Sequence, residues 1–171
     1  MAEQIVNKVA ESGIITLDLE QYYPKEELVV FDLANYLFMG LILKEKDFRE
    51  SLKQFDWESY RGKIVTVTCS ADAIIPSWAY MLVVTYLQPV ATQLFQGTEE
   101  ECRKQIFLET IRQIDYSQYQ DKRLVIKGCG DLPIGSFAYF EITRLLLPYA
   151  KSIMYGEPCS TVPVYKRKLP A

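Results

Sequence analysis

The chain has 171 residues, a net charge of −3 and no histidine. A chain of this length forms one domain or two closely packed halves, and it buries enough surface to fold without disulfides. The absence of histidine removes the usual general base, the Ser/His and Cys/His nucleophile pairs and imidazole metal ligands. Acidic and basic residues are interspersed, which argues against a nucleic-acid-binding protein, and the basic run at residues 166–168 is too short to change that.

Residues 2–11 predict a short amphipathic helix and do not have the apolar character of a signal peptide. Residues 73–98 carry no charge, but Pro76 and Pro89 leave too few apolar residues between them for a membrane span. We therefore expect a cytoplasmic protein with reduced thiols that does not contact a membrane.

Two strands are predicted next. Residues 14–19 alternate apolar and polar side chains, and residues 28–33 form a second apolar run. A turn at residues 22–26 lies between them, so the two strands predict an N-terminal β-hairpin. Residues 34–43 are apolar without a clear period and are broken by Gly40.

From residue 45 onward, the chain predicts two copies of one α-β-α-β unit. A shift of 59 residues aligns residues 48–97 on residues 107–156 without a gap. The identical pairs include Asp56/Asp115, Tyr60/Tyr119, Asp72/Asp131, Pro89/Pro148 and Gly97/Gly156. An ungapped match that contains so much Tyr, Pro and Gly indicates an internal duplication.

The elements of the two copies follow from local patterns. The first copy predicts a helix over 45–55, a strand over 64–68, a helix over 76–87 and a strand over 91–95. The second predicts a helix over 99–114, a strand over 123–127, a helix over 134–146 and a strand over 152–155. The second helix of each copy is closed by a proline, because proline cannot continue the helical hydrogen-bond ladder.

The predicted fold class is therefore α/β. Two pseudo-symmetric α-β-α-β repeats form one mixed, largely parallel sheet flanked by helices, and the N-terminal hairpin precedes them. We expect a single domain over residues 1–171, with the helix and hairpin in 1–44, the repeats in 45–97 and 98–156, and an extended tail over 157–171.

Three of the four cysteines follow predicted strands. Cys69, Cys129 and Cys159 each lie just beyond a strand, and Asp72 and Asp131 accompany the first two. Since the carboxyl ends of parallel strands meet at one edge of a sheet, we expect these five side chains to converge. Three thiolates and one carboxylate satisfy a four-coordinate site for zinc or iron. Asp72 or Asp131 is then the fourth ligand, and the other caps a helix.

Other interpretations stay open, because no two of these cysteines form a C-x-x-C pair. The three are also compatible with buried packing residues at strand ends. Alternatively, Cys69 or Cys129 is the reactive thiol of a Cys-dependent enzyme, such as a sulfur-transfer enzyme. A third interpretation is an interaction module with aromatic-rich surfaces and inert cysteines. Cys102 lies inside a predicted helix and is expected to be a small core residue.

Several strings in the chain are distinctive. ITLDLEQYYP, LILKEKDF, CSADAIIPSWAYML, VIKGC and SIMYGEPCSTVPVYKR resemble a bacterial family catalogued as domain of unknown function 2480, and the likeness covers nearly the whole chain. Genes of that family stand beside those of the sulfur-mobilisation iron–sulfur assembly system. The resemblance therefore implies an accessory role in that pathway.

Scaffolds of that pathway hold metal by three Cys and one Asp, which fits Cys69, Cys129, Cys159 and one of the two aspartates. We accordingly expect a non-catalytic, thiolate-rich protein that handles a metal or an iron–sulfur cluster. The expected partners are iron–sulfur assembly proteins, with no nucleic acid and no membrane, and a homodimer is left open.

Overall fold

The computed structural model describes residues 13–128, 130–157 and 160–168, which contain four α-helices and seven strands. The chain divides into two compact units. Unit 1 comprises Met1–Pro24 and Ile106–Ala171, and unit 2 comprises Lys25–Gln105. The helix that we predict over residues 2–11 lies outside the described residues.

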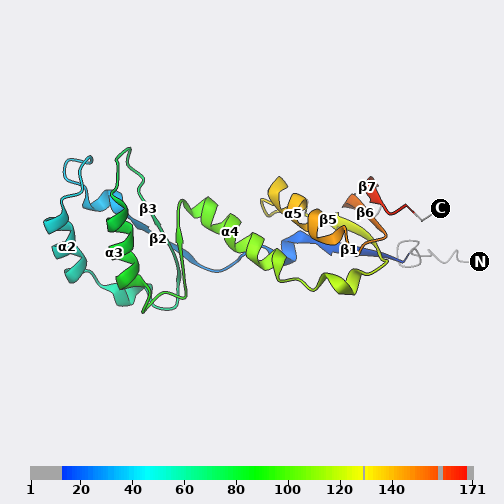
Figure 1. The fold of residues 1–171 in the computed structure, drawn as a ribbon, viewed down its shortest axis with the longest axis horizontal. Coiled ribbons are helices and arrows are strands. Elements are labelled where there is room, and N and C mark those ends of the chain that lie inside the picture. The colour runs from blue at the N-terminus through cyan, green and yellow to red at the C-terminus, as the bar shows by residue number, and fades with distance from the viewer. Residues whose placement is uncertain (1–12, 129, 158–159, 169–171) are drawn as a thin grey trace, which may run out of the picture. The chain divides into compact units, whose positions relative to one another are not determined.

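Unit 2 is built on a parallel sheet with the strand order β2-β3-β4. The strands are β2 (Leu28–Asp32), β3 (Ile64–Thr68) and β4 (Gln93–Gln96). The helices α2 (Glu45–Gln54) and α3 (Ser77–Leu87) lie on the same side of these strands (Figure 1). The central strand β3 is buried along almost its whole length, which explains why its sequence is continuously β-branched instead of alternating.

Aromatic rings fill much of the core of unit 2. Phe31, only 2% exposed, stacks on Tyr36 and on Trp57 with ring centroids 5.4 Å apart in both pairs. Phe55 meets the same ring edge-on at 5.7 Å. These offset and edge-on geometries are the favourable ones for aromatic pairs, so Phe31 is a central packing residue of this unit.

Unit 1 is built on a second sheet, with the order β1-β5-β6-β7. The strands β1 (Ile14–Asp18), β5 (Arg123–Lys127) and β6 (Ser152–Glu157) are parallel, and β7 (Ser160–Lys166) runs antiparallel to β6. The helix α4 (Glu99–Arg112) contributes Phe107 and Ile111 to the core of unit 1, and α5 (Ser136–Leu146) contributes Ile142 and Leu146.

The α/β class, the mostly parallel pairing and the positions of the elements expected between residues 14 and 156 are confirmed, and two details of the expected fold are wrong. The strands form two sheets where we expected one. The N-terminal strands do not form a hairpin, because β1 pairs with β5 and β2 pairs with β3. The segment between them holds the 3-10 helix η1 (Leu19–Tyr22), and it is longer than the two-to-five-residue turns that usually join hairpin strands. The tail, expected to be extended, contains β7.

The order of elements is the same in the two units, except that unit 1 ends with the additional strand β7. In each, a strand and a 3-10 helix are followed by a helix, a second 3-10 helix, a strand, a helix and a strand. The residues aligned by the 59-residue shift occupy corresponding elements, with β3 matching β5 and α3 matching α5. The internal duplication stays a prediction. The first strand of each unit, β1 or β2, lies before residue 45 and therefore outside the two repeats that we defined.

Candidate functional site

The expected metal ligands do not follow strands of one sheet. Cys69 and Asp72 follow β3, whereas Asp131 follows β5 of the other sheet, and Cys129 and Cys159 lie outside the described residues. The strands before these residues therefore do not share one sheet edge, contrary to our expectation. Within residues 13–128, 130–157 and 160–168, no group of three or more His, Cys, Asp and Glu side chains could hold a metal ion. The complete ligand set stays a prediction.

Cys69 lies at the carboxyl edge of the unit 2 sheet, next to Asp32 and Tyr80. Its thiol is half-buried and donates a hydrogen bond to the carbonyl oxygen of Ala71 at 3.6 Å. The Asp32 carboxylate accepts hydrogen bonds from the backbone N–H groups of Ala34, at 2.9 Å, and Ser70, at 3.0 Å. This network fixes the start of the loop that carries Cys69.

Two ionisable groups at this edge are perturbed. Burial opposes ionisation of Asp32, but its hydrogen bonds with Ser70 and Ala34 outweigh that effect and lower its pKa. Burial, with added contributions from Cys69 and Asp32, raises the pKa of the Tyr80 hydroxyl. The Asp32 carboxylate is therefore held ionised and the Tyr80 phenol is held neutral, which stabilises this edge of the sheet. Both pKa values move away from neutral pH, so the two groups do not form an acid–base pair tuned to it.

Neither Asp72 nor Asp131 caps a helix, contrary to our expectation. Both are exposed, and the helices α3 and α5 begin after Pro76 and Gly135 without any side-chain cap. Carboxylates cap 3-10 helices instead: Asp32 caps η2 (Leu33–Tyr36), and its counterpart Asp18 caps η1 by accepting a hydrogen bond from the N–H of Glu20 at 3.1 Å. Asp115 caps η4 (Tyr116–Tyr119) in the same way. The sequence signal for Asp18 and Asp32 is an Asp at the last position of a strand, followed by a buried leucine in both units.

The carboxyl edge of the unit 1 sheet holds an ion-pair cluster. The Lys127 ammonium lies 3.2 Å from an oxygen of Asp18 and 3.9 Å from one of Glu157. The hydrogen bond to Asp18, reinforced by the charge of Glu157, raises the pKa of Lys127. Glu20 accepts a hydrogen bond from the N–H of Gly130 at 2.6 Å. Asp18, Glu157 and Glu20 are thus each bound to a lysine or to the backbone.

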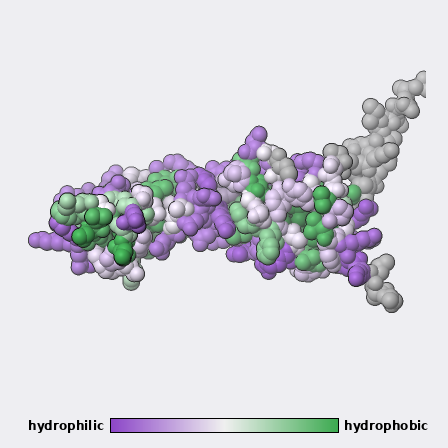
Figure 2. Space-filling view, turned by 90° about the horizontal axis from the view of Figure 1, so that it is seen from above, coloured by the Kyte–Doolittle hydropathy of each residue, from purple (hydrophilic) through white to green (hydrophobic). Residues whose placement is uncertain are grey.

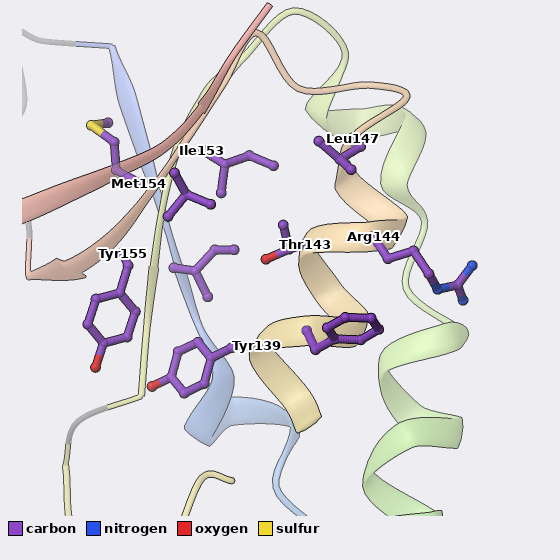
Figure 3. Close-up of a pocket in the computed structure, with 10 residues that line it drawn as sticks. Tyr139, Thr143, Arg144, Leu147, Ile153, Met154 and Tyr155 are labelled. Atoms are coloured by element: carbon purple, nitrogen blue, oxygen red, sulfur yellow. The ribbon is translucent and has the colours of Figure 1, made fainter. Parts of the chain in front are cut away.

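One concave surface in unit 1 is an apolar groove of about 510 Å³ between α5 and the strands β6 and β7 (Figure 3). Ile153 points from β6 toward α5, and Tyr139 and Tyr155 lie side by side at one end. The guanidinium of Arg144, the only charged group of the lining, points away from the strands. The lining residues are Ile126, Tyr139, Phe140, Thr143, Arg144, Leu147, Ile153, Met154, Tyr155 and Val164.

The apolar groove exists because the helical layer ends there. The parallel strands β5 and β6 are joined through α5, whereas β7 follows β6 directly and brings no helix with it. Apolar side chains on α5 and at its carboxyl end consequently stay exposed, with Phe140 at 73% and Leu147 at 40%. Exposed apolar groups gathered in one groove are typical of a binding surface.

A charged cluster flanks the groove. One oxygen of Glu141 accepts hydrogen bonds from Arg112 at 2.7 Å and from Arg144 at 2.8 Å, and the other accepts from Arg144 at 3.1 Å. The hydrogen bonds from Arg144 and Arg112 lower the pKa of the buried Glu141 to about 2. Two guanidinium groups share one carboxylate, so this cluster on α4 and α5 carries one surplus positive charge.

Unit 2 exposes apolar side chains on residues 38–42, which we call the apolar loop. Met39 is 81% exposed, and Phe38, Leu41 and Ile42 are also exposed. The loop is an ordered turn: the N–H of Phe38 donates to the carbonyl oxygen of Ile42 at 2.8 Å, and Met39 and Gly40 both have positive φ. Hydrophobic side chains gather on unit 2, at the left of Figure 2.

These features define an α/β protein of two parallel-sheet units with two exposed apolar surfaces. A family model described as "Protein of unknown function (DUF2480)" matches residues 3–167, and the chain belongs to that family. Neither a curated protein nor a solved structure matches the chain. Among the described residues, no helix combines the length and the apolar composition that a membrane crossing requires.

Neither the groove nor the apolar loop was predicted from the sequence. A signal for the loop was present in the apolar run at residues 34–43, which fits neither a helical nor a strand period. The groove had no local signal, because its lining comes from two strands and a helix that meet only in the folded chain.

Proposed function

We propose that this protein is a non-catalytic interaction module that binds the apolar face of a helix from a partner protein. The observation that carries the proposal is the apolar groove beside α5. A helix from a partner, placed in this groove, completes the helical layer over β6 and β7. Such a helix meets the apolar side chains that line the groove. The surplus charge of the cluster at Glu141 favours a partner helix with acidic residues beside its apolar face.

The apolar loop supports the same function independently. Monomeric soluble proteins rarely expose contiguous apolar patches without a binding role, and residues 38–42 place four large apolar side chains on one turn. The loop offers a second contact surface within unit 2.

Photo-crosslinking tests the groove directly. Replacing Phe140 by p-benzoylphenylalanine places a photoreactive ring in the groove, and irradiation in cells should attach it to a partner. Mass spectrometry should map the attachment to an amphipathic helix with acidic flanking residues. In binding measurements with that helix, Phe140→Asp should weaken affinity at least about tenfold, because it places a charge in an apolar contact.

A probe at the exposed residue Gln120, in the same unit, is the matched control and should give no product. Products that attach to many unrelated segments, or equally from both positions, would refute a specific groove. Attachment to a second copy of this chain would show instead that the groove is a homodimer interface.

A second candidate function is the handling of zinc, iron or an iron–sulfur cluster in the cytoplasm, with iron–sulfur assembly proteins as partners. One observation favours it: the parallel strands β5 and β6 are neighbours, and Cys129 and Cys159 follow them closely in the chain. Asp131 also follows β5, so Cys129, Cys159 and Asp131 are the central ligands of the proposed site. Cys69 and Asp72 belong to the other unit and are its remaining candidate ligands.

Metal analysis tests this second function. Protein purified without chelator and without oxygen should contain about one zinc or iron per chain if three thiolates bind it. Cys129→Ser and Cys159→Ser should each remove the metal, and Cys69→Ser tests whether unit 2 supplies a ligand. Cys102→Ser, at a buried core position, should retain it. Metal-free wild-type protein would exclude this function.

A further inference from the structure

A second, strongly basic pocket lies in unit 1, at the end of the sheet where β5 and β6 begin and β7 ends. It has a volume of about 1260 Å³. Its charged lining consists of five cations and one carboxylate, namely Arg123, Lys151, Lys166, Arg167, Lys168 and Asp121. Since the whole chain has a net charge of −3, this is a marked local concentration of positive charge.

Strand pairing brings these cations together from distant parts of the chain. Arg123 on β5 pairs with Ser152 on β6, which in turn pairs with Lys166 on β7, so the three positions form one row across the sheet. The N–H of Arg167 then donates to the carbonyl oxygen of Lys151 at 2.9 Å. The short basic run at residues 166–168 is thereby joined by Arg123 and Lys151.

Arg167 has a structural role in this pocket. It pairs with Asp121 and donates a hydrogen bond to the carbonyl oxygen of Tyr149 at 2.7 Å, which fixes the end of β7. In the part of the chain that the structure describes, none of the other four cations forms an ion pair. Four like charges that share one pocket repel one another, and a bound anion relieves that repulsion.

The rest of the lining is partly apolar. Met154, Pro163 and Tyr165 contribute carbon surface to the same pocket. A ligand that satisfies both parts therefore combines several negative charges with a hydrocarbon or aromatic group. Phosphate groups suit the charged part, because guanidinium and ammonium groups bind phosphate oxygens through short, charge-assisted hydrogen bonds.

We propose that this pocket binds a small soluble molecule that carries two or more phosphate groups joined to an apolar or aromatic part. The cations line a hollow at one end of the sheet and are not spread along a stripe, which is the arrangement a nucleic-acid backbone requires. None of the charged residues of this pocket lines the apolar groove. Substituting them therefore tests this proposal without testing the proposed binding of a partner helix.

Isothermal titration of the full chain at low salt, without added divalent metal, tests the proposal with ATP and pyrophosphate as probes. ATP should bind with a Kd below about 100 μM and more tightly than pyrophosphate, since it also contacts the apolar part. The double variant Lys151→Ala/Lys166→Ala should weaken ATP binding about tenfold or more, because it removes two charge-assisted contacts.

The matched control is Lys25→Ala/Lys46→Ala, which removes the same net charge from exposed positions of unit 2 and should change the Kd less than about twofold. Equal weakening in both double variants would show non-specific attraction and overturn the proposal. Absence of ATP and pyrophosphate binding at millimolar concentration would also overturn it. Binding only to anionic phospholipid vesicles or to single-stranded RNA, with no response to ATP, would do the same.

Discussion

Replacing Phe31 by alanine should lower the free energy of unfolding of unit 2 by about 3–5 kcal/mol, the usual cost of removing a large aromatic side chain from a core. Phe31 is almost completely buried and pairs with four other aromatic rings, so the substitution removes both apolar burial and favourable ring contacts. The surrounding rings are large and rigid, which limits how far they can collapse into the cavity.

Urea unfolding followed by tryptophan fluorescence measures this loss, because both tryptophans, Trp57 and Trp78, belong to unit 2. The neighbouring substitution Val30→Ala is the matched control. Val30 lies on the other face of β2 and is partly exposed, so its loss should cost less than about 1 kcal/mol. A Phe31→Ala protein that unfolds within 1 kcal/mol of the wild type would contradict the packing described here.

In unit 1, two adjacent leucines should behave differently. Leu146 is 0% exposed and packs in the core, so Leu146→Ala should lower the free energy of unfolding of unit 1 by about 2–5 kcal/mol. Leu147 lines the apolar groove, and Leu147→Ala should cost less than about 1 kcal/mol because much of its side chain already meets solvent. The same change should weaken binding of a partner helix.

Thermal unfolding followed by far-UV circular dichroism compares the two variants with the wild type. The tryptophan signal of unit 2 serves as an internal reference, because neither leucine belongs to that unit. Equal destabilisation by the two substitutions would mean that Leu147 is a core residue and that the groove is closed in solution. An unchanged stability of Leu146→Ala would contradict the core assignment.

Local pattern was sufficient to place most elements. The strands β3 and β5 lie where predicted, residue for residue, because each is a short aliphatic run bounded by polar turns. The helices α3 and α5 end just before Pro89 and Pro148, as the loss of a backbone donor requires. These features depend on near neighbours in the chain, which a sequence displays directly.

Pairing between strands was not predictable in the same way. The hydrophobic pattern of β1 is compatible with pairing to any parallel strand. No feature of the sequence near β1 identifies β5 as its partner strand. Pro163 lacks a backbone donor, and it obscured β7, which tolerates it as an edge strand. The error of one sheet in place of two followed from assigning β1 and β2 to each other.

The same limit applied to the candidate sites. Sequence position identified Cys69, Cys129 and Cys159 as residues that follow strands, but the division into two sheets removed the expected common edge. Part of the basic pocket could be recognised in the sequence as the basic run at residues 166–168. Its other basic residues, Arg123 and Lys151, could be assigned to the pocket only from the register of the paired strands.

The interruption of unit 1 by unit 2 has a consequence for how the chain is made. On the ribosome, β1 emerges early, yet its partner β5 is synthesised about 110 residues later, and such distant pairings form slowly. Unit 2 is continuous in sequence, so it is complete while β1 still lacks its partner strand β5. A nascent chain that has emerged from the ribosome as far as residue 105 should therefore display a finished unit 2 and an unpaired strand β1, which is a target for chaperones during translation.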